Sequence, residues 1–172
     1  NLKFSGVLFN FFVSIFLYFL IYKFRFSVYG ILFVFLFTGF FGYCTGCIIS
    51  SILLKSNNYY VVTMALSTTG LLFLLLSAYT LFSRKNFNFL NGFIFISFIL
   101  LIFIIVVNIF FSFSILHLII TYFIIVFSSA VILYETSEMI YNGETNYILV
   151  TISLYCAIYN IFISFLGVFN SD

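Results

Sequence analysis

Charged side chains are scarce in this sequence, which has 172 residues but only six Lys or Arg and four Asp or Glu. Soluble domains carry charge on about a quarter of their residues. So few charged groups cannot supply the polar part of a water-facing surface, which leaves lipid as the solvent that fits this chain. The net charge of +2, without a basic patch, also excludes a nucleic-acid-binding protein.

Proline and tryptophan are absent, and cysteine is rare. Without proline, the helices have no proline-induced kinks. The three cysteines are Cys44, Cys47 and Cys156, and an odd number of cysteines within apolar runs does not indicate a disulfide framework. Cys44 and Cys47 have the spacing of a redox motif without its usual sequence context, so we interpret them as packing residues.

Long apolar runs are what the sequence does contain, since 65% of its residues are hydrophobic. The hydrocarbon core of a bilayer, about 30 Å thick, is crossed by roughly 20 apolar residues in a helix. The runs therefore predict an all-α, polytopic transmembrane bundle with six helices in a single domain, residues 1–172. The predicted spans are residues 4–22, 28–53, 59–82, 89–111, 114–137 and 146–169.

Polar residues mark two helix starts that hydropathy alone leaves open. The break between the fourth and fifth spans is expected at residues 112–114, with Ser114 as the N-cap. Before the sixth span, Thr145 or Asn146 is expected to cap the helix.

The basic residues predict how the chain is oriented, because Lys and Arg concentrate in cytoplasmic connections. Four of them fall on one side of the membrane and two on the other: Lys23, Arg25, Arg84 and Lys85 against Lys3 and Lys55. This bias places the connections at residues 23–27, 83–88 and 138–145 in the cytoplasm.

Glu135 is the most informative polar residue, because it falls at the C-terminal end of the fifth span. There its carboxylate lies near hydrocarbon and faces the negative end of the helix dipole. Either it has a function inside the membrane or it snorkels to cytoplasmic water. In the sixth span, Asn160 needs a partner on another helix. We therefore expect a candidate polar intramembrane site made of Glu135, Asn160, Tyr155 and Tyr159.

Small residues recur in the second span, where Gly39, Gly42 and Gly46 follow i, i+3, i+7 spacing. Such a stripe lets helix backbones approach closely, so we interpret it as a helix-packing surface.

Motifs for catalysis are missing from the sequence: it has no Gly-rich phosphate loop, zincin helix or nucleophile elbow. Two neighbouring cysteines and the single distant His117 do not make a credible metal site. We interpret His117 as an interfacial residue, and we expect no enzymatic activity, no cofactor and no metal.

The last third of the chain carries the most specific pattern, an NGETNYI turn at 142–148 followed by SLYCAIYNIF at 153–162. Together with TGFFGY at 38–43 and SAYTLFSRKNFNFLNG at 77–92, these segments resemble the Bax inhibitor-1 family. The resemblance covers most of the chain and implies a fold of seven membrane helices with the last one in the centre. This chain would then correspond to helices two to seven.

The resemblance also carries the functional expectations. Similarity to bacterial members implies an inner-membrane protein whose partners are the lipid bilayer and the membrane-bound FtsH protease complex, which it modulates. The alternative is a pH-sensitive calcium or cation leak channel. Leak members of the family pair two carboxylates, of which Glu135 matches the first, whereas Ala157 occupies the position of the second. A hydrophobic subunit of an organellar respiratory complex fits the composition, but the NGETNYI segment argues against it.

Overall fold

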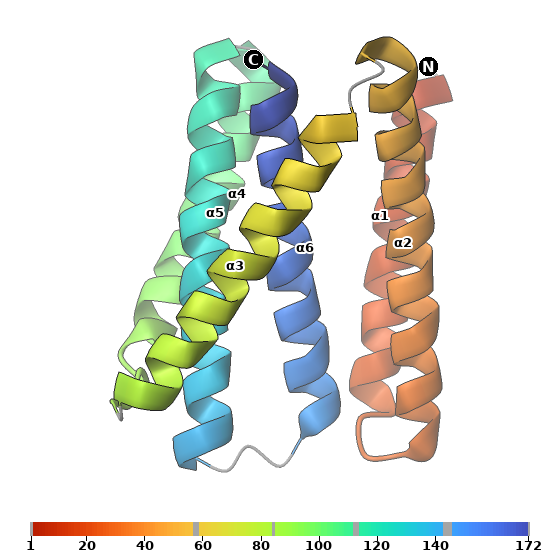
Figure 1. Cartoon of the computed structure of the whole chain (residues 1–172). Coiled ribbons are helices and arrows are strands. Elements are labelled where there is room, and N and C mark those ends of the chain that lie inside the picture. Colours follow the sequence, from red (N-terminus) through yellow and green to blue (C-terminus); the bar gives the residue numbers. More distant parts are fainter. Residues whose placement is uncertain (1, 57–58, 84, 112–113, 143–145, 172) are drawn as a thin grey trace.

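In the part of the chain that the structure describes, six α-helices account for almost every residue, and Figure 1 shows how they are arranged. The computed structural model describes the backbone of residues 2–56, 59–83, 85–111, 114–142 and 146–171, and the side chains of residues 13–54, 59–83, 85–108, 118–141 and 146–170. The helices are α1 (Leu2–Lys23), α2 (Val28–Ser56), α3 (Tyr59–Ser83), α4 (Leu90–Phe111), α5 (Ser114–Ser137) and α6 (Tyr147–Ser171). The prediction of an all-α bundle of six helices is confirmed.

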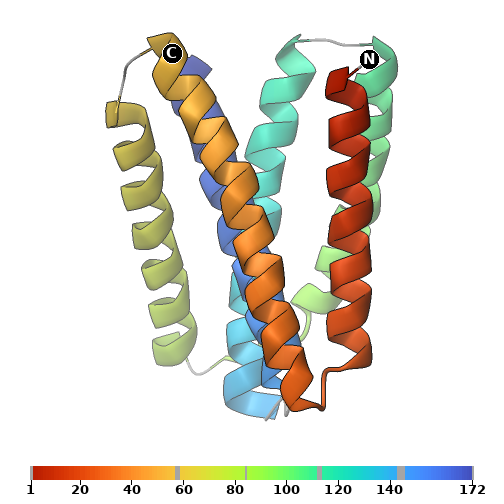
Figure 2. The ribbon, with the colours of Figure 1, turned by 90° about the vertical axis from the view of Figure 1, so that its right-hand side faces the viewer.

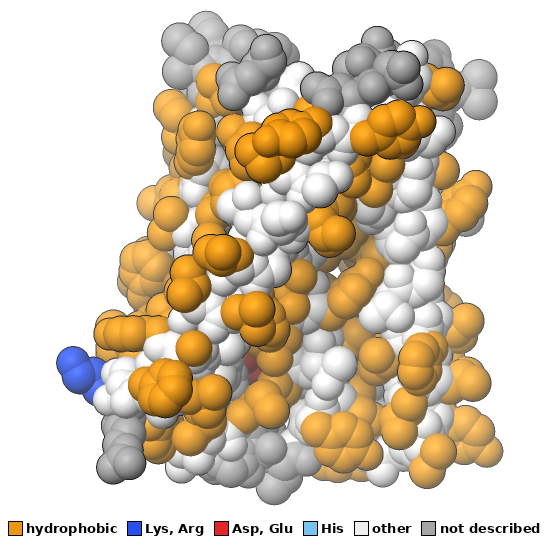
Figure 3. Space-filling view, in the orientation of Figure 1, with side chains coloured by type: hydrophobic (Ala, Val, Ile, Leu, Met, Phe, Trp, Pro, Cys, Tyr) orange, Lys and Arg blue, Asp and Glu red, His pale blue; other side chains and the backbone are white. Residues whose placement is uncertain are grey.

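Most of the helices, as far as their residues are described, are long and apolar enough to cross a bilayer. Five qualify by length and hydropathy: Val28–Leu54, Tyr59–Ser83, Leu90–Asn108, Leu118–Tyr141 and Tyr147–Asn170. In α1 the segment with described side chains, Val13–Lys23, is shorter, so a sixth crossing stays a prediction. Hydrophobic side chains are spread over the face shown in Figure 3, and basic ones are visible only near one end. The chain is a multi-pass membrane protein.

The α1–α2, α3–α4 and α5–α6 connections lie at one end of the bundle, opposite both termini (Figure 1). These are the three connections predicted to face the cytoplasm, and that sidedness stays a prediction. In the last of them, residues 138–142 form a π-helix, η1 (Glu138–Asn142), where a loop was expected. The cap predicted for α6 is confirmed at Asn146, whose Oδ1 accepts a hydrogen bond of 3.3 Å from the Leu149 amide. Thr145, the other candidate cap, lies outside the described residues.

Helix α6 runs through the middle of the bundle. It contacts α1, α2, α3 and α5, and Figures 1 and 2 show it between the α1–α2 pair and the remaining helices. In the apolar 18-residue segment of α6, 33% of the residues are buried, compared with 6% in the corresponding segment of α2. Ala157 and Ile161 of α6 pack with Ile132 of α5 in one buried cluster. The expected central position of the last helix agrees with this arrangement.

The glycines of α2 have two different environments. A Cβ atom added to Gly30 would lie 2.6 Å from the Phe24 carbonyl oxygen and 2.7 Å from Ile148 Cδ1, so only glycine fits there. Added at Gly39, Gly42 or Gly46, it would meet no heavy atom within 4 Å. The predicted packing surface is therefore wrong for this stripe within the described chain, because no helix lies against it.

Candidate functional site

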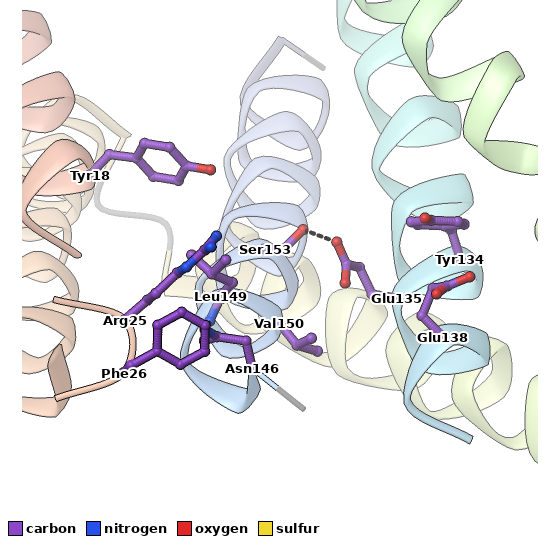
Figure 4. Close-up of a pocket in the computed structure, with 10 residues that line it drawn as sticks. All are labelled: Tyr18, Arg25, Phe26, Tyr134, Glu135, Glu138, Asn146, Leu149, Val150 and Ser153. Atoms are coloured by element: carbon purple, nitrogen blue, oxygen red, sulfur yellow. Dashed lines mark hydrogen bonds between the residues drawn. The ribbon is translucent and has the colours of Figure 1, made fainter. Parts of the chain in front are cut away.

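Glu135, near the end of α5, faces Ser153 of α6. The Ser153 hydroxyl donates a hydrogen bond of 2.6 Å to Glu135 Oε1, drawn as the dashed line in Figure 4. Both side chains are partly buried in a protein with few charged groups. A carboxylate in such surroundings is stabilised by each donor that reaches it, and hydrogen bonds to an ionised acceptor are short and strong.

A cavity of about 410 Å³ surrounds this pair. We call it the interfacial cavity, because it lies where several helices end. Its walls come from α1, the α1–α2 turn, α5, η1 and α6: Tyr18, Arg25, Phe26, Tyr134, Glu135, Glu138, Asn146, Leu149, Val150 and Ser153. In Figure 4, Arg25 extends from the turn toward α6, and Glu135 points toward α6 from the opposite side. A cation and an anion thus border the same space.

The position of Arg25 is set by its aromatic neighbours. Its Cζ atom lies 4.7 Å from the ring centroid of Tyr22 and 4.9 Å from that of Phe26. Contact between a guanidinium and an aromatic face contributes about 0.5–1 kcal/mol at exposed sites. These contacts hold the guanidinium at the cavity wall. The sequence identified Arg25 only as a topology signal, and nothing in its local pattern shows that it shares a cavity with Glu135.

A second cavity of about 310 Å³ adjoins the first, and we call it the inner cavity. The two cavities share five wall residues: Tyr18, Tyr134, Glu135, Leu149 and Ser153. Apart from these, the inner cavity is lined mostly by apolar side chains of α4, α5 and α6: Ile94, Phe98, Phe127, Val131, Ile152, Cys156 and Ala157. Its other two lining residues are Ser128 and Asn160.

Ser128 is the unusual member of this lining. It is 1% exposed, and its Oγ atom has no hydrogen-bond partner in the structure. A buried hydroxyl without a partner costs about 1–3 kcal/mol. The inner cavity therefore offers an unused hydroxyl group in a wall that is lined mostly by apolar side chains.

The structure divides the four residues predicted to form one polar site into two pairs. Glu135 and Asn160 both line the inner cavity. Tyr155 and Tyr159 instead line a separate apolar groove between α2, α3 and α6, with a volume of about 560 Å³. Tyr155 donates a hydrogen bond of 3.3 Å to the Thr38 carbonyl oxygen. These two tyrosines therefore do not join Glu135 and Asn160 around one cavity.

Aromatic packing explains where the two tyrosines point. The rings of Tyr155 and Tyr159 are stacked with centroids 6.3 Å apart, and Phe41 of α2 packs edge-on against Tyr159 at 4.9 Å. The same groove contains Gly42 and Gly46 of the glycine stripe. These glycines widen the groove instead of bringing two helices together.

Ala157 also lines the inner cavity, on the same wall as Ser153. It is 3% exposed and packs against Ile132 and Ile161. The position that carries a second carboxylate in leak members of the resembled family is here a buried methyl group. The side chain of His117, expected at the interface, lies outside the described residues.

Comparison with known proteins extends these observations. A family model described as inhibitor of apoptosis-promoting Bax1 matches residues 2–172. An uncharacterized protein of Pseudomonas aeruginosa is 47% identical over 154 residues, which cover 90% of this chain and 69% of the relative. A protein of Escherichia coli K12 named modulator of FtsH protease YccA is 43% identical over 152 residues, which cover 88% of this chain and 69% of the relative. A protein of Escherichia coli O6:H1 with the same identity and coverage is named inner membrane protein YccA.

Proposed function

This chain belongs to the family of the inhibitor of apoptosis-promoting Bax1, and from that membership we propose that it modulates the membrane-bound FtsH protease. The observation that carries the proposal is the 43% identity, over 88% of the chain, to a protein named as a modulator of that protease. The inner-membrane location predicted from the sequence agrees with the name of the Escherichia coli O6:H1 relative. The proposed role acts through contact and needs no catalytic step by this chain.

The surface best suited to that contact is η1, at the end of α5. Met139, Ile140 and Tyr141 are consecutive apolar side chains, exposed by 51%, 40% and 37%. Contiguous exposed apolar side chains mark contact sites with other proteins or with the membrane. Ser137, the residue directly before η1, is held in place because the Phe87 amide donates a hydrogen bond of 3.0 Å to Ser137 Oγ. A partner would therefore meet a defined surface.

Co-purification with FtsH tests the proposal. The tagged chain should enrich FtsH from solubilised membranes, and Ile140→Ser combined with Tyr141→Ser should lower that enrichment several-fold. Leu54→Ser is the matched control and should leave enrichment unchanged. Leu54 is an 86% exposed apolar residue near the C-terminal end of α2, which lies at the other end of the bundle from η1. Enrichment no greater than that of an unrelated membrane protein would reject the proposal.

A pH-sensitive calcium or cation leak is the second candidate, and one observation favours it. Glu135 lines both the interfacial and the inner cavity, so its carboxylate would border a route that joined the two. Ala157 weakens this candidate, because a methyl group cannot share a proton with Glu135. Calcium flux into liposomes decides the matter: a leak through this route requires Glu135→Gln to reduce flux, and equal flux removes Glu135 from any transport role.

A further inference from the structure

The polar residues of the inner cavity lie at two depths along the bundle. At the outer end, Ser153 of α6 bonds to Glu135 of α5, and these two helices run antiparallel (Figure 1). Ser128 precedes Glu135 by seven residues, Asn160 follows Ser153 by seven, and all four line the cavity. Seven residues are close to two helical turns, so Ser128 and Asn160 lie about 10 Å farther from the end of α5 than the outer pair. The inner cavity therefore has a second polar end, deeper in the bundle.

The deep end of the cavity presents hydrogen-bond donors. Ser128 Oγ is buried, has no hydrogen-bond partner in the structure and belongs to a residue that lines the cavity. Asn160, an exposed residue, lines the same cavity, and its side-chain amide carries two N–H donors. A ligand with an acceptor at this position would remove the cost of about 1–3 kcal/mol of leaving the Ser128 hydroxyl unpaired.

Aromatic side chains form much of the wall around these donors. Tyr18 of α1, Phe98 of α4, and Phe127 and Tyr134 of α5 all line the inner cavity. The ring centroids of Phe98 and Phe127 are 6.4 Å apart, with 32° between the ring planes. Contacts between aromatic rings contribute about 0.5–1.5 kcal/mol beyond the burial of area. This wall favours a flat ring over a flexible acyl chain.

Charge and depth restrict the ligand further. In the described part of the chain, Glu135 is the one charged side chain that lines the inner cavity, and its carboxylate disfavours an anion such as a fatty acid. A phospholipid keeps its polar groups in the interfacial region, whereas Ser128 lies about 10 Å deeper than Glu135. The ligand that fits is neutral, soluble in hydrocarbon, and carries a carbonyl acceptor on a ring.

We propose that the inner cavity binds the head group of an isoprenoid quinone, a neutral ring with carbonyl acceptors that dissolves in the bilayer. One carbonyl oxygen accepts hydrogen bonds from Ser128 and Asn160, the ring lies against Phe98 and Phe127, and the isoprenoid tail extends into lipid. The proposal concerns binding alone and includes no electron transfer. It does not depend on FtsH, so the site can exist whether or not that protease is the partner.

Matched ligands test the chemistry of the site. The unmodified protein in phosphatidylcholine nanodiscs is equilibrated with equal amounts of decylubiquinone, decylbenzene, decanol or decanoate, and bound molecules are counted by native mass spectrometry. Decylubiquinone should bind about fivefold more tightly than decylbenzene, which has a ring and the same chain but no acceptor for a hydrogen bond. Equal binding of decylbenzene, tighter binding of decanol, or equal binding of decanoate would each overturn the proposal, because they contradict the acceptor, the ring and the neutral charge in turn.

Variants test the two donors. Ser128→Ala and Asn160→Leu should each weaken decylubiquinone binding about fivefold, as the loss of one hydrogen bond would produce. Ser129→Ala is the control for Ser128 and should leave binding unchanged, since Ser129 Oγ already donates a hydrogen bond of 2.7 Å to the Ile125 carbonyl oxygen. Thermal unfolding without quinone confirms that Ser128→Ala folds, because the change removes an unpaired hydroxyl and should not lower stability. Unchanged affinity in both donor variants would reject the site.

Photolabelling locates the ring. An azidoquinone should label peptides that contain Phe98 or Phe127, and an excess of decylubiquinone should prevent that labelling. The apolar groove that contains Tyr155 and Tyr159 is the competing location in the same protein. Labelling confined to peptides of that groove on α2 and α3 would place the quinone there and overturn the proposal.

Discussion

Glu135 and Ser153 join the two most extensively packed helices of the bundle, since the Ser153 hydroxyl donates a 2.6 Å hydrogen bond from α6 to the carboxylate on α5. The pair sits in the shared wall of the two cavities. Its geometry gives the carboxylate a fixed direction, facing the side where Arg25 also lies. The first prediction below depends on this hydrogen bond.

Ser153→Ala removes this donor and leaves the carboxylate with one hydrogen bond fewer. Because both groups are partly buried, we expect a loss of about 1–2 kcal/mol in the free energy of unfolding. Thermal unfolding in detergent measures it. Thr151→Ala is the control, as Thr151 is exposed and its hydroxyl donates a hydrogen bond to the Tyr147 carbonyl oxygen of its own helix. Equal effects of the two changes would show that the interhelical bond adds nothing.

Gly30→Ala should destabilise the protein, because the added methyl group meets the Phe24 carbonyl oxygen at 2.6 Å. Overpacking of this kind costs about 1–3 kcal/mol. Gly42→Ala is the matched change in the same helix, with no heavy atom within 4 Å of the new Cβ atom. There the higher helix propensity of alanine should leave stability unchanged or raise it by up to about 1 kcal/mol. If the unfolding temperatures of both variants changed in the same direction, the predicted difference between the two glycines would be contradicted.

Ser137→Ala should loosen the connection between α3 and α4. The buried Phe87 amide loses its 3.0 Å acceptor, and an unsatisfied buried donor costs about 1–3 kcal/mol. Hydrogen exchange at the Phe87 amide should accelerate by about fivefold or more. Unchanged exchange would mean that another acceptor replaces the serine hydroxyl.

Tyr155→Phe tests whether ring packing or the hydroxyl holds α6 against α2. The change removes the 3.3 Å bond to the Thr38 carbonyl but keeps the contacts with Phe41 and Tyr159. We expect the free energy of unfolding to fall by less than about 1 kcal/mol, because the Thr38 carbonyl oxygen keeps its hydrogen bond within α2. Phe41→Ala should cost about 3 kcal/mol because it removes a ring from the same cluster. Chemical unfolding in mixed micelles measures the loss of stability in both variants. If Tyr155→Phe lost more stability than Phe41→Ala, the hydroxyl and not ring packing would hold α6 against α2.

Much of the fold could be predicted from the sequence, because the bilayer fixes the length of an apolar helix and most of the few charged groups fall between the long apolar runs. The spans predicted at 28–53 and 59–82 correspond to α2 (Val28–Ser56) and α3 (Tyr59–Ser83). The cap at Asn146 also follows from local chemistry, since an amide oxygen can reach the free amides of the first turn.

The candidate site could be predicted only in part. Glu135 is identified by its type, because a carboxylate inside a membrane span needs an explanation. Grouping Tyr155 and Tyr159 with it failed for a physical reason. In a helix that is apolar on all sides, lipid-facing and protein-facing residues look alike, so periodicity does not reveal which face meets which neighbour.

The sequence by itself determined that this protein is a membrane-embedded helical bundle, because scarcity of charge and long apolar runs act on each segment independently of the others. Only the tertiary structure decided that Arg25 and Glu135 border one cavity, that Ser128 is buried without a partner, and that the glycines of α2 widen a groove. These relationships join residues far apart along the chain. They depend on how the helices are rotated and placed against one another, which no local pattern encodes.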